Sequence, residues 1–174
     1  MEFSAIRDRR FYLNIADPAP CNGTITRWRY CYYGPSSLLS ASYRVTFAVY
    51  RNDMTDSGGL YYQRVSRTFT ADRVATSQNP ISSGFNCHDE LDIGSEAVEI
   101  QRGDIVGACI FDPNDYLIFV HSQLDVVGEA SGYSLLEMRD ISECDFNAVP
   151  NQILVSNLRE QTSRILHLYA DIGM

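Results

Sequence analysis

Short segments with alternating apolar and polar side chains are the feature that most limits what this chain can fold into. About ten such segments, rich in valine, isoleucine, threonine and aromatic residues, are separated by turns that contain glycine, proline, asparagine or aspartate. No apolar stripe with a helical period extends over three turns. The pattern therefore predicts an all-β fold, namely an antiparallel two-sheet sandwich or jelly roll.

The predicted strands are spread along the whole chain. They are residues 11–15, 24–33, 43–51, 60–70, 85–91, 97–100, 105–111, 116–121, 124–128, 133–138, 153–155 and 164–172. The segment 43–51 alternates most regularly and predicts a half-buried strand, whereas the apolar run 105–111 predicts a central strand. Residues 52–59 and 72–84 predict loops, and residues 101–104 predict a tight turn.

The stretch from Cys21 to Tyr33 holds the only tryptophan, two of the five cysteines and the only Asn-x-Ser/Thr acceptor, Asn22. Within it, the Asn-Gly pair at residues 22–23 predicts a turn into a strand, and the Gly-Pro pair at residues 34–35 predicts the end of that strand. From Thr24 onward the residues are β-branched and aromatic, as in a strand. We expect this strand to lie at the centre of the core.

The length of 174 residues, with 45% hydrophobic and 21% charged residues, suits one domain with one core. Pro18 and Pro20, just before Cys21, end the strand-like pattern of the preceding residues. We expect residues 1–20 to form an N-terminal extension with an entry strand or a strand donated to a neighbour. Residues 21–174 are then a single β-sandwich domain.

Charge limits the partners that the chain can have. All fourteen basic residues are arginine, and twenty-two acidic residues give a net charge of −8. Binding to phosphate requires a basic stripe, and the sequence has none, so we expect neither nucleic acid nor an anionic membrane surface as a partner. No apolar run reaches about 18 residues, so we also expect no membrane insertion.

The cysteines and Asn22 indicate the compartment. The N-terminal sequence lacks the pattern of a signal peptide, which fits an intracellular protein, a mature chain or an excised module. Cys21, Cys31, Cys87 and Cys109 lie in strand-like sequence without the spacing of zinc or redox sites. Together with Asn22 as a possible glycosylation site, they favour an extracellular, secreted protein over one with buried reduced thiols.

The spacing of the cysteines limits how they can pair. In a continuous strand at about 3.3 Å per residue, Cys21 and Cys31 are more than about 20 Å apart, whereas a disulfide needs Cα atoms within about 7 Å. We therefore expect these two cysteines to pair with Cys87 and Cys109 rather than with each other. Cys144 is left over, either as a buried thiol or as an interchain disulfide.

No sequence motif indicates catalysis, a cofactor or a metal. His88 precedes two acids, but neighbouring side chains of a strand point to opposite faces, and His121 and His167 stand alone in apolar strands. Acids in the loops around Asp53 and Asp112 could bind calcium, but they lack the EF-hand spacing and suit turns equally well. We predict no catalytic residue, no cofactor and no metal ligand.

The tripeptide Arg102-Gly103-Asp104 matches the motif that integrins bind on extracellular ligands. For that role, the guanidinium and the carboxylate would have to be exposed at the tip of a turn. Glycine and aspartate are also what a tight turn before the strand 105–111 requires, and an aspartate that caps its own turn cannot reach a receptor. We favour the turn.

Consecutive tyrosines are the better candidates for partner binding. Tyr32 with Tyr33 and Tyr61 with Tyr62 form pairs in predicted strands, so one member of each pair should face away from the core. Outward tyrosines offer rigid, amphipathic contact area for a protein or a sugar. Cross-strand packing on the sheet surface is the alternative.

Three stretches of the chain have distinctive sequences: residues 20–33, with Cys-Asn-Gly-Thr near the start, residues 46–51, and residues 103–109, which read Gly-Asp-Ile-Val-Gly-Ala-Cys. They resemble a β-rich module of secreted and cell-surface proteins of marine invertebrates such as sponges and cnidarians. The resemblance extends from Cys21 to Ile172, and no activity is assigned to such modules. It implies that the four paired cysteines are structural and that Asn22 is glycosylated. In such modules no arginine precedes the glycine and acid, which further disfavours integrin binding.

These observations predict a non-enzymatic extracellular adhesion or recognition module that binds a protein or a glycan through loops and outward tyrosines. The alternative is a structural subunit that assembles with copies of itself into an extracellular filament or matrix, because strand edges can extend a sheet between subunits. A hydrolase with a site gathered from distant loops is a weaker third prediction.

Overall fold

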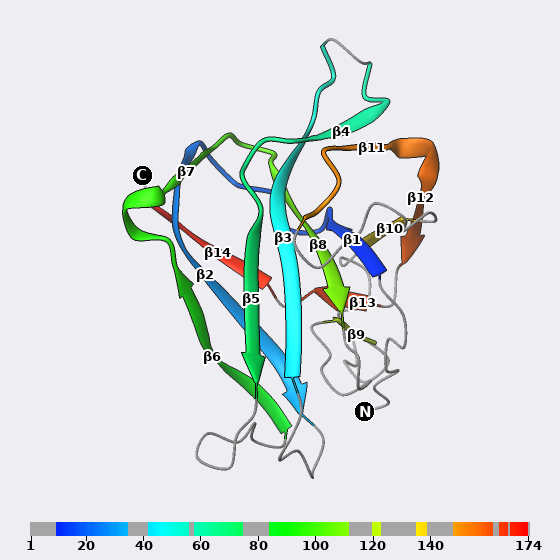
Figure 1. Cartoon of the computed structure of the whole chain (residues 1–174). Coiled ribbons are helices and arrows are strands. Elements are labelled where there is room, and N and C mark those ends of the chain that lie inside the picture. The colour runs from blue at the N-terminus through cyan, green and yellow to red at the C-terminus, as the bar shows by residue number, and fades with distance from the viewer. Residues whose placement is uncertain are drawn as a thin grey trace.

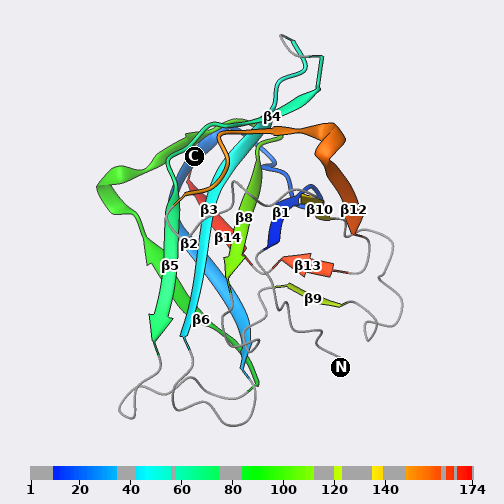
Figure 2. The same ribbon diagram turned by 45° about the vertical axis from the view of Figure 1, so that its right-hand side comes forward.

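The computed structural model describes residues 10–34, 42–55, 58–74, 84–111, 120–122, 135–138, 148–161, 164–166 and 168–173. Within these ranges the chain forms fourteen strands and two short 3-10 helices (Figures 1 and 2). The strands are β1 (Arg10–Asn14), β2 (Gly23–Gly34), β3 (Ser42–Asn52), β4 (Tyr61–Arg64), β5 (Phe69–Val74), β6 (Gly84–Asp92), β7 (Val98–Ile100), β8 (Ile105–Phe111), β9 (Val120–Ser122), β10 (Leu135–Met138), β11 (Gln152–Leu154), β12 (Leu158–Gln161), β13 (Arg164–Leu166) and β14 (Leu168–Gly173). The helices are η1 (Gly94–Glu96) and η2 (Val155–Asn157), and neither is long enough to cross a membrane.

The strands pair in antiparallel fashion, which confirms the predicted all-β class. The large sheet has the order β11-β4-β3-β8-β1-β10-β12, with β5 also paired to β3. The small sheet has the order β14-β2-β6, with β7 also paired to β2, and β9 pairs with β13 apart from both sheets. Figures 1 and 2 show β3 and β5 of the large sheet crossing over β2 and β6 of the small sheet. This arrangement is compatible with a sandwich, and the jelly-roll topology stays a prediction.

The first core lies between the large and the small sheet. Trp28 of β2 is fully buried, and its ring centroid lies 4.9 Å from that of Phe47 and 5.5 Å from that of Phe69. The ring of Trp28 meets Phe47 edge to face, a favourable arrangement of aromatic quadrupoles. Inward-facing side chains of both sheets complete this core: Tyr12, Ile25, Tyr30, Val45, Val49, Ala71, Ile93, Ile100, Ala108, Leu135 and Leu168. The strand predicted at residues 24–33 therefore does lie at the centre of a core.

A second core covers the other face of the large sheet. Ala48 and Tyr50 of β3 are fully buried there, and the Tyr50 hydroxyl donates a hydrogen bond to the Pro150 carbonyl at 2.7 Å. The other members are Phe11, Leu13, Ile105, Cys109, Met138, Val149, Ile153 and Leu158. The prediction of a half-buried strand at residues 43–51 is therefore wrong. Residues 148–158, far along the chain, cover the face that would otherwise be exposed to solvent.

The first described strand, β1, lies inside the large sheet between β8 and β10. Phe11 stands opposite Cys109, and Leu13 stands opposite Leu136, and the side chains of Phe11, Tyr12 and Leu13 are fully buried. The segment predicted as an entry or donated strand thus completes the sheet of its own chain. Residues 1–9 lie outside the described ranges.

The segment predicted as one strand at residues 60–70 forms two strands, β4 and β5. Both pair with β3, but four residues, 65–68, stand opposite only Ala48 and Val49. Val65 N donates to Val49 O at 2.9 Å, and Ser66 Oγ accepts from Val49 N at 2.9 Å, so a side chain replaces part of the ladder. Residues 65–68 are a bulge with two extra residues, which turns the chain out of the sheet.

Other boundaries differ in smaller ways. β12 was not predicted and pairs with β10 at the edge of the large sheet. β5 continues to Val74, into the predicted loop 72–84. Of the predicted strand 116–121 the structure describes only the last two residues, in β9, and the predicted strand 124–128 lies outside the described ranges.

Candidate functional site

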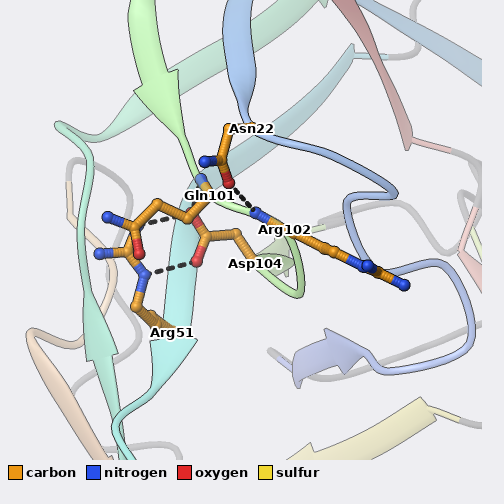
Figure 3. Close-up of polar contacts among 5 residues, drawn as sticks. All are labelled: Asn22, Arg51, Gln101, Arg102 and Asp104. Atoms are coloured by element: carbon orange, nitrogen blue, oxygen red, sulfur yellow. Dashed lines mark hydrogen bonds and ion pairs between the residues drawn. The ribbon is translucent and has the colours of Figure 1, made fainter.

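The tight turn at residues 101–104 joins β7 to β8 and carries the Arg-Gly-Asp tripeptide. Gly103 has a φ of 92°, which side chains other than that of glycine rarely allow. Asp104 Oδ2 accepts a hydrogen bond from Gln101 N at 2.8 Å, and its side chain is 1% exposed, whereas the side chain of Arg102 points away (Figure 3). Asp104 therefore caps its own turn, as the turn hypothesis predicts, and its carboxylate is not accessible to an integrin.

Arg51, at the end of β3, contacts the same carboxylate. Its Nε and Nη2 atoms donate to Asp104 Oδ1 and Oδ2, both at 2.7 Å (Figure 3). The hydrogen bond to Asp104 raises the pKa of Arg51 above its ordinary value, so the guanidinium stays charged. An arginine has five N–H donors, and the donors that Asp104 does not use have no partner in the described part of the chain. With 32% of its side chain exposed, Arg51 can offer these donors to a ligand.

Asn22 lies beside the same turn. Its side chain is exposed, and its Oδ1 atom accepts a hydrogen bond from Arg102 N at 2.9 Å (Figure 3). The following Gly23 approaches β14 so closely that a Cβ atom would lie 2.6 Å from Ile172 Cγ2 and 2.7 Å from Gly173 O. The close approach of the two strands therefore requires the glycine that follows Asn22. Glycosylation of Asn22 stays a prediction, and the exposure of its side chain is compatible with it.

Arg67 of the bulge at residues 65–68 contacts the helix η1. Arg67 Nη2 lies 3.0 Å from Glu96 Oε2, and Arg67 Nη1 donates to Glu96 O at 3.0 Å. The Arg67 guanidinium also lies over the ring of Phe69, 4.4 Å from its centroid. The strand β7, which follows η1, belongs to the small sheet. The contact between Arg67 and Glu96 therefore links the large sheet to the small sheet.

Together these residues line an open groove of about 840 Å³ between the two sheets. Its polar lining consists of Asn22, Thr24, Arg51, Ser66, Arg67, Glu96, Glu99 and Gln101, and its aliphatic lining of Val65, Val98 and Ile100. Arg67 is paired with Glu96, and Arg51 is paired with Asp104. Glu99 has no ion-pair partner in the described part of the chain, and the four charged residues of the lining, two arginines and two glutamates, sum to zero.

The predicted tyrosine sites lie elsewhere. Tyr62 of β4 stands opposite Ile153 and packs against the second core, and burial raises its pKa. Tyr61 stands opposite Leu154 and is partly buried. Neither tyrosine lines the groove. The side chains of Tyr32 and Tyr33 lie outside the described part of the structure.

Cys21 is a free, partly exposed thiol, so the prediction of a disulfide at this residue is wrong for this structure. It lies in the bend before β2. Cys109, by contrast, is disulfide-bonded and fully buried in the second core, across the large sheet from β2. The large sheet therefore separates the two cysteines.

The backbone also indicates where Cys31 and Cys87 lie. They belong to β2 and β6, which pack against the first core, whereas Cys109 faces the second core. This disfavours the predicted pairing of Cys31 with Cys109. Because Tyr30 pairs with Asp89 and Tyr32 with Asn86, the backbone of Cys31 lies opposite residues 87 and 88, where the register shifts. Cys144 lies outside the described residues.

Asp53, considered above as a calcium ligand, stabilises its own loop. Its Oδ1 atom accepts hydrogen bonds from Thr55 N and Thr55 Oγ1 at 2.9 and 2.7 Å. In the described ranges no three His, Cys, Asp or Glu residues are grouped as metal ligands would be. The loop acids at 56 and 112–115 and the side chains of His88, His121 and His167 fall outside what the structure describes.

Sequence reasoning did not single out Arg51, although a signal was present. In β3 the inward-facing residues are Val45, Phe47 and Val49, and the next residue on that face is Arg51. A charged side chain on the inward face requires an opposite charge nearby, and Asp104 supplies it. The bulge at residues 65–68 had no such signal, since the alternation of residues 60–70 continues through it.

The fold and the groove define a two-layer, antiparallel all-β protein with a polar groove at one end of the layers. Comparison of the chain with protein-family models, curated proteins and solved structures finds no match in any of the three. The groove is therefore the feature of the molecule that indicates a function.

Proposed function

We propose that the protein is a non-enzymatic, extracellular recognition module that binds a neutral glycan in the groove between its two sheets. The observation that carries this proposal is the guanidinium of Arg51, which Asp104 holds in place while other N–H donors remain unused. Fixed donors bind a sugar hydroxyl with little loss of side-chain entropy on binding.

The other groove residues support a sugar ligand. Gln101 and Asn22 contribute amides, Glu99 contributes a carboxylate, and Val98 and Ile100 contribute apolar surface for the C–H face of a sugar ring. The charges of the lining balance, and the Glu99 carboxylate, which has no ion-pair partner in the described part of the chain, disfavours acidic sugars, so neutral oligosaccharides fit best.

Binding to a glycan array tests this proposal. We expect protein without an N-glycan to bind neutral oligosaccharides more strongly than uronic or sialic acids, and Gln101→Ala to weaken this binding about five-fold or more, because one side-chain hydrogen bond is lost. Gln101 is exposed, so the substitution should leave the unfolding midpoint unchanged. The matched control is Gln152→Ala, an exposed glutamine on β11, which should bind like the wild type. Binding that is absent, or equal in the two variants, contradicts the proposal.

Asn22 adds a second comparison. A glycan on this residue would begin at the rim of the same groove. Protein glycosylated at Asn22 should therefore bind the array less strongly than protein without the glycan. Production of the protein in an oxidising, glycosylating host also shows whether the protein is secreted and whether Asn22 carries a glycan, and so tests both of these proposals.

Self-assembly is a second candidate function, favoured by one exposed apolar surface. Met54, Leu60, Leu154 and Val155 are exposed large apolar residues, with Leu60 at 63% exposure. Val155 N donates to Leu60 O at 2.9 Å, and Leu154 lies on β11, an edge strand of the large sheet. An apolar surface beside an open strand edge is typical of a contact between subunits.

Light scattering separates the two candidates. If self-assembly is the function, the wild type will exceed its monomer mass of 19.6 kDa, and Leu60→Ser will return it toward that mass, because the substitution removes exposed apolar area without changing a core. Addition of reductant shows whether an interchain disulfide, such as one at Cys144, contributes. A wild type that is monomeric with and without reductant rules out self-assembly and leaves the recognition module.

A further inference from the structure

A second, more enclosed pocket of about 240 Å³ lies deeper between the two sheets. Its walls are mostly aliphatic, from Ile25, Val49, Ile100, Val106, Leu168 and Ile172. An apolar cavity of about 150 Å³ can bind benzene, so this pocket has room for a substituted ring or a short branched chain. Ile100 also lines the groove, and Ile25, Val49, Ile100 and Leu168 belong to the first core.

Asn14, the last residue of β1, is the unusual member of the lining. It is 8% exposed, and its side chain has no hydrogen bond to the described part of the chain. In β1, Phe11 and Leu13 face the second core, so Asn14 shares the inward face with Tyr12. Asn14 is not among the residues whose side-chain N or O atoms are fully buried without a partner, so its amide still reaches solvent, and a ligand in the pocket can take the place of that water.

The pocket is bounded by a stiff segment, residues 17–20. Ala19 N donates to Asp104 O at 2.7 Å, and Gly103 N donates to Ala19 O at 2.8 Å. The prolines on either side of Ala19 fix their own φ angles. The segment is therefore held by two backbone hydrogen bonds, and the pocket is formed before any ligand arrives.

Charge narrows the class of ligand. Asp17 and Asp104 both line the pocket, so a carboxylate ligand would be repelled. A cation would lose its hydration among aliphatic walls, and Asp104 is already paired with Arg51. A neutral molecule with an apolar body and one hydrogen-bonding group fits both conditions.

From the volume, the aliphatic walls and the unpartnered amide, we propose that this pocket binds a small neutral molecule whose ring or branched chain fills the cavity and whose hydroxyl or carbonyl group hydrogen-bonds to Asn14. This pocket is a second site beside the groove, although Ile100 lines both and Asp104 in its wall pairs with Arg51 of the groove, and its ligand differs from the proposed glycan. It explains why an asparagine occupies a buried position on the inward face of β1, where an aliphatic residue would otherwise pack.

NMR titration with p-cresol and toluene tests the proposal, because the two probes differ only by a hydroxyl. In the wild type, both should shift the methyl signals of Ile25, Val106 and Ile172, and p-cresol should bind roughly ten-fold more tightly because its hydroxyl satisfies the amide. Asn14→Leu should erase or reverse that preference while the pocket still binds toluene. Ala170→Leu, which fills the pocket from β14, should abolish the binding of both probes.

Three outcomes would overturn the proposal. The first is that neither probe shifts these methyl signals at millimolar concentration, which would mean that the pocket holds only water. The second is equal binding of the two probes by the wild type, and the third is an unchanged preference for p-cresol in Asn14→Leu. If Asn14→Leu does not fold, the wild-type comparison and Ala170→Leu still decide. Ala170 does not line the groove, so Ala170→Leu should leave glycan binding unchanged. A failure of the pocket proposal can therefore be distinguished from a failure of the glycan proposal.

Discussion

Trp28→Ala is expected to lower the free energy of unfolding by about 3–5 kcal/mol, a large part of the total of about 5–15 kcal/mol for a domain. Trp28 is fully buried and contacts both Phe47 and Phe69, so its removal leaves a cavity between the two sheets. Urea unfolding followed by far-UV circular dichroism measures the change, since the variant has no tryptophan to report by fluorescence.

Trp28→Phe is the matched control for this prediction. Trp28 Nε1 has no hydrogen-bond partner in the described structure, so phenylalanine removes volume but no hydrogen bond. We expect it to cost at most about half of what alanine costs. A phenylalanine variant as unstable as the alanine variant would mean that Nε1 has a partner and that the indole contributes by more than its packing.

The fold class could be predicted because local pattern determines it. Strands such as β2, β3 and β8 are rich in β-branched and aromatic residues and are bounded by turn residues, and these local signals give strand positions directly. What local pattern could not give is which faces are covered. Tyr50 and Ala48 look exposed by alternation, and only the distant residues 148–158 bury them.

The candidate site was predicted in part. The turn at residues 101–104 followed from glycine and aspartate, and the same logic correctly placed the Asp104 carboxylate on its own turn. The groove depends on a bulge and on an ion pair between residues 53 positions apart in the sequence, and no local pattern encodes such a pairing. The disulfide prediction failed at Cys21 for a related reason, since sequence spacing does not tell which side of a sheet a cysteine faces.

Arg51→Met is the second substitution with a large expected effect, a loss of about 3 kcal/mol or more in the free energy of unfolding. It leaves the Asp104 carboxylate, 1% exposed, without a counter-ion, and an unpaired buried charge is strongly destabilising. Arg29→Met is the matched control. Arg29 pairs with Asp171 on the surface, where 55% of the Arg29 side chain is exposed, so that variant should lose at most about 1 kcal/mol.

A double-mutant cycle separates the ion pair from the packing of the arginine stem. The variant Arg51→Met with Asp104→Leu removes both charges, so it should be more stable than the sum of the two single losses predicts, by at least about 1 kcal/mol. Circular dichroism during urea unfolding gives all four free energies. Additive losses would show that Asp104 does not depend on Arg51, and the groove would then lack the fixed guanidinium on which the glycan proposal rests. A strong coupling would instead establish that the Arg51–Asp104 ion pair stabilises the fold, as expected if Asp104 holds the guanidinium in place beside the groove.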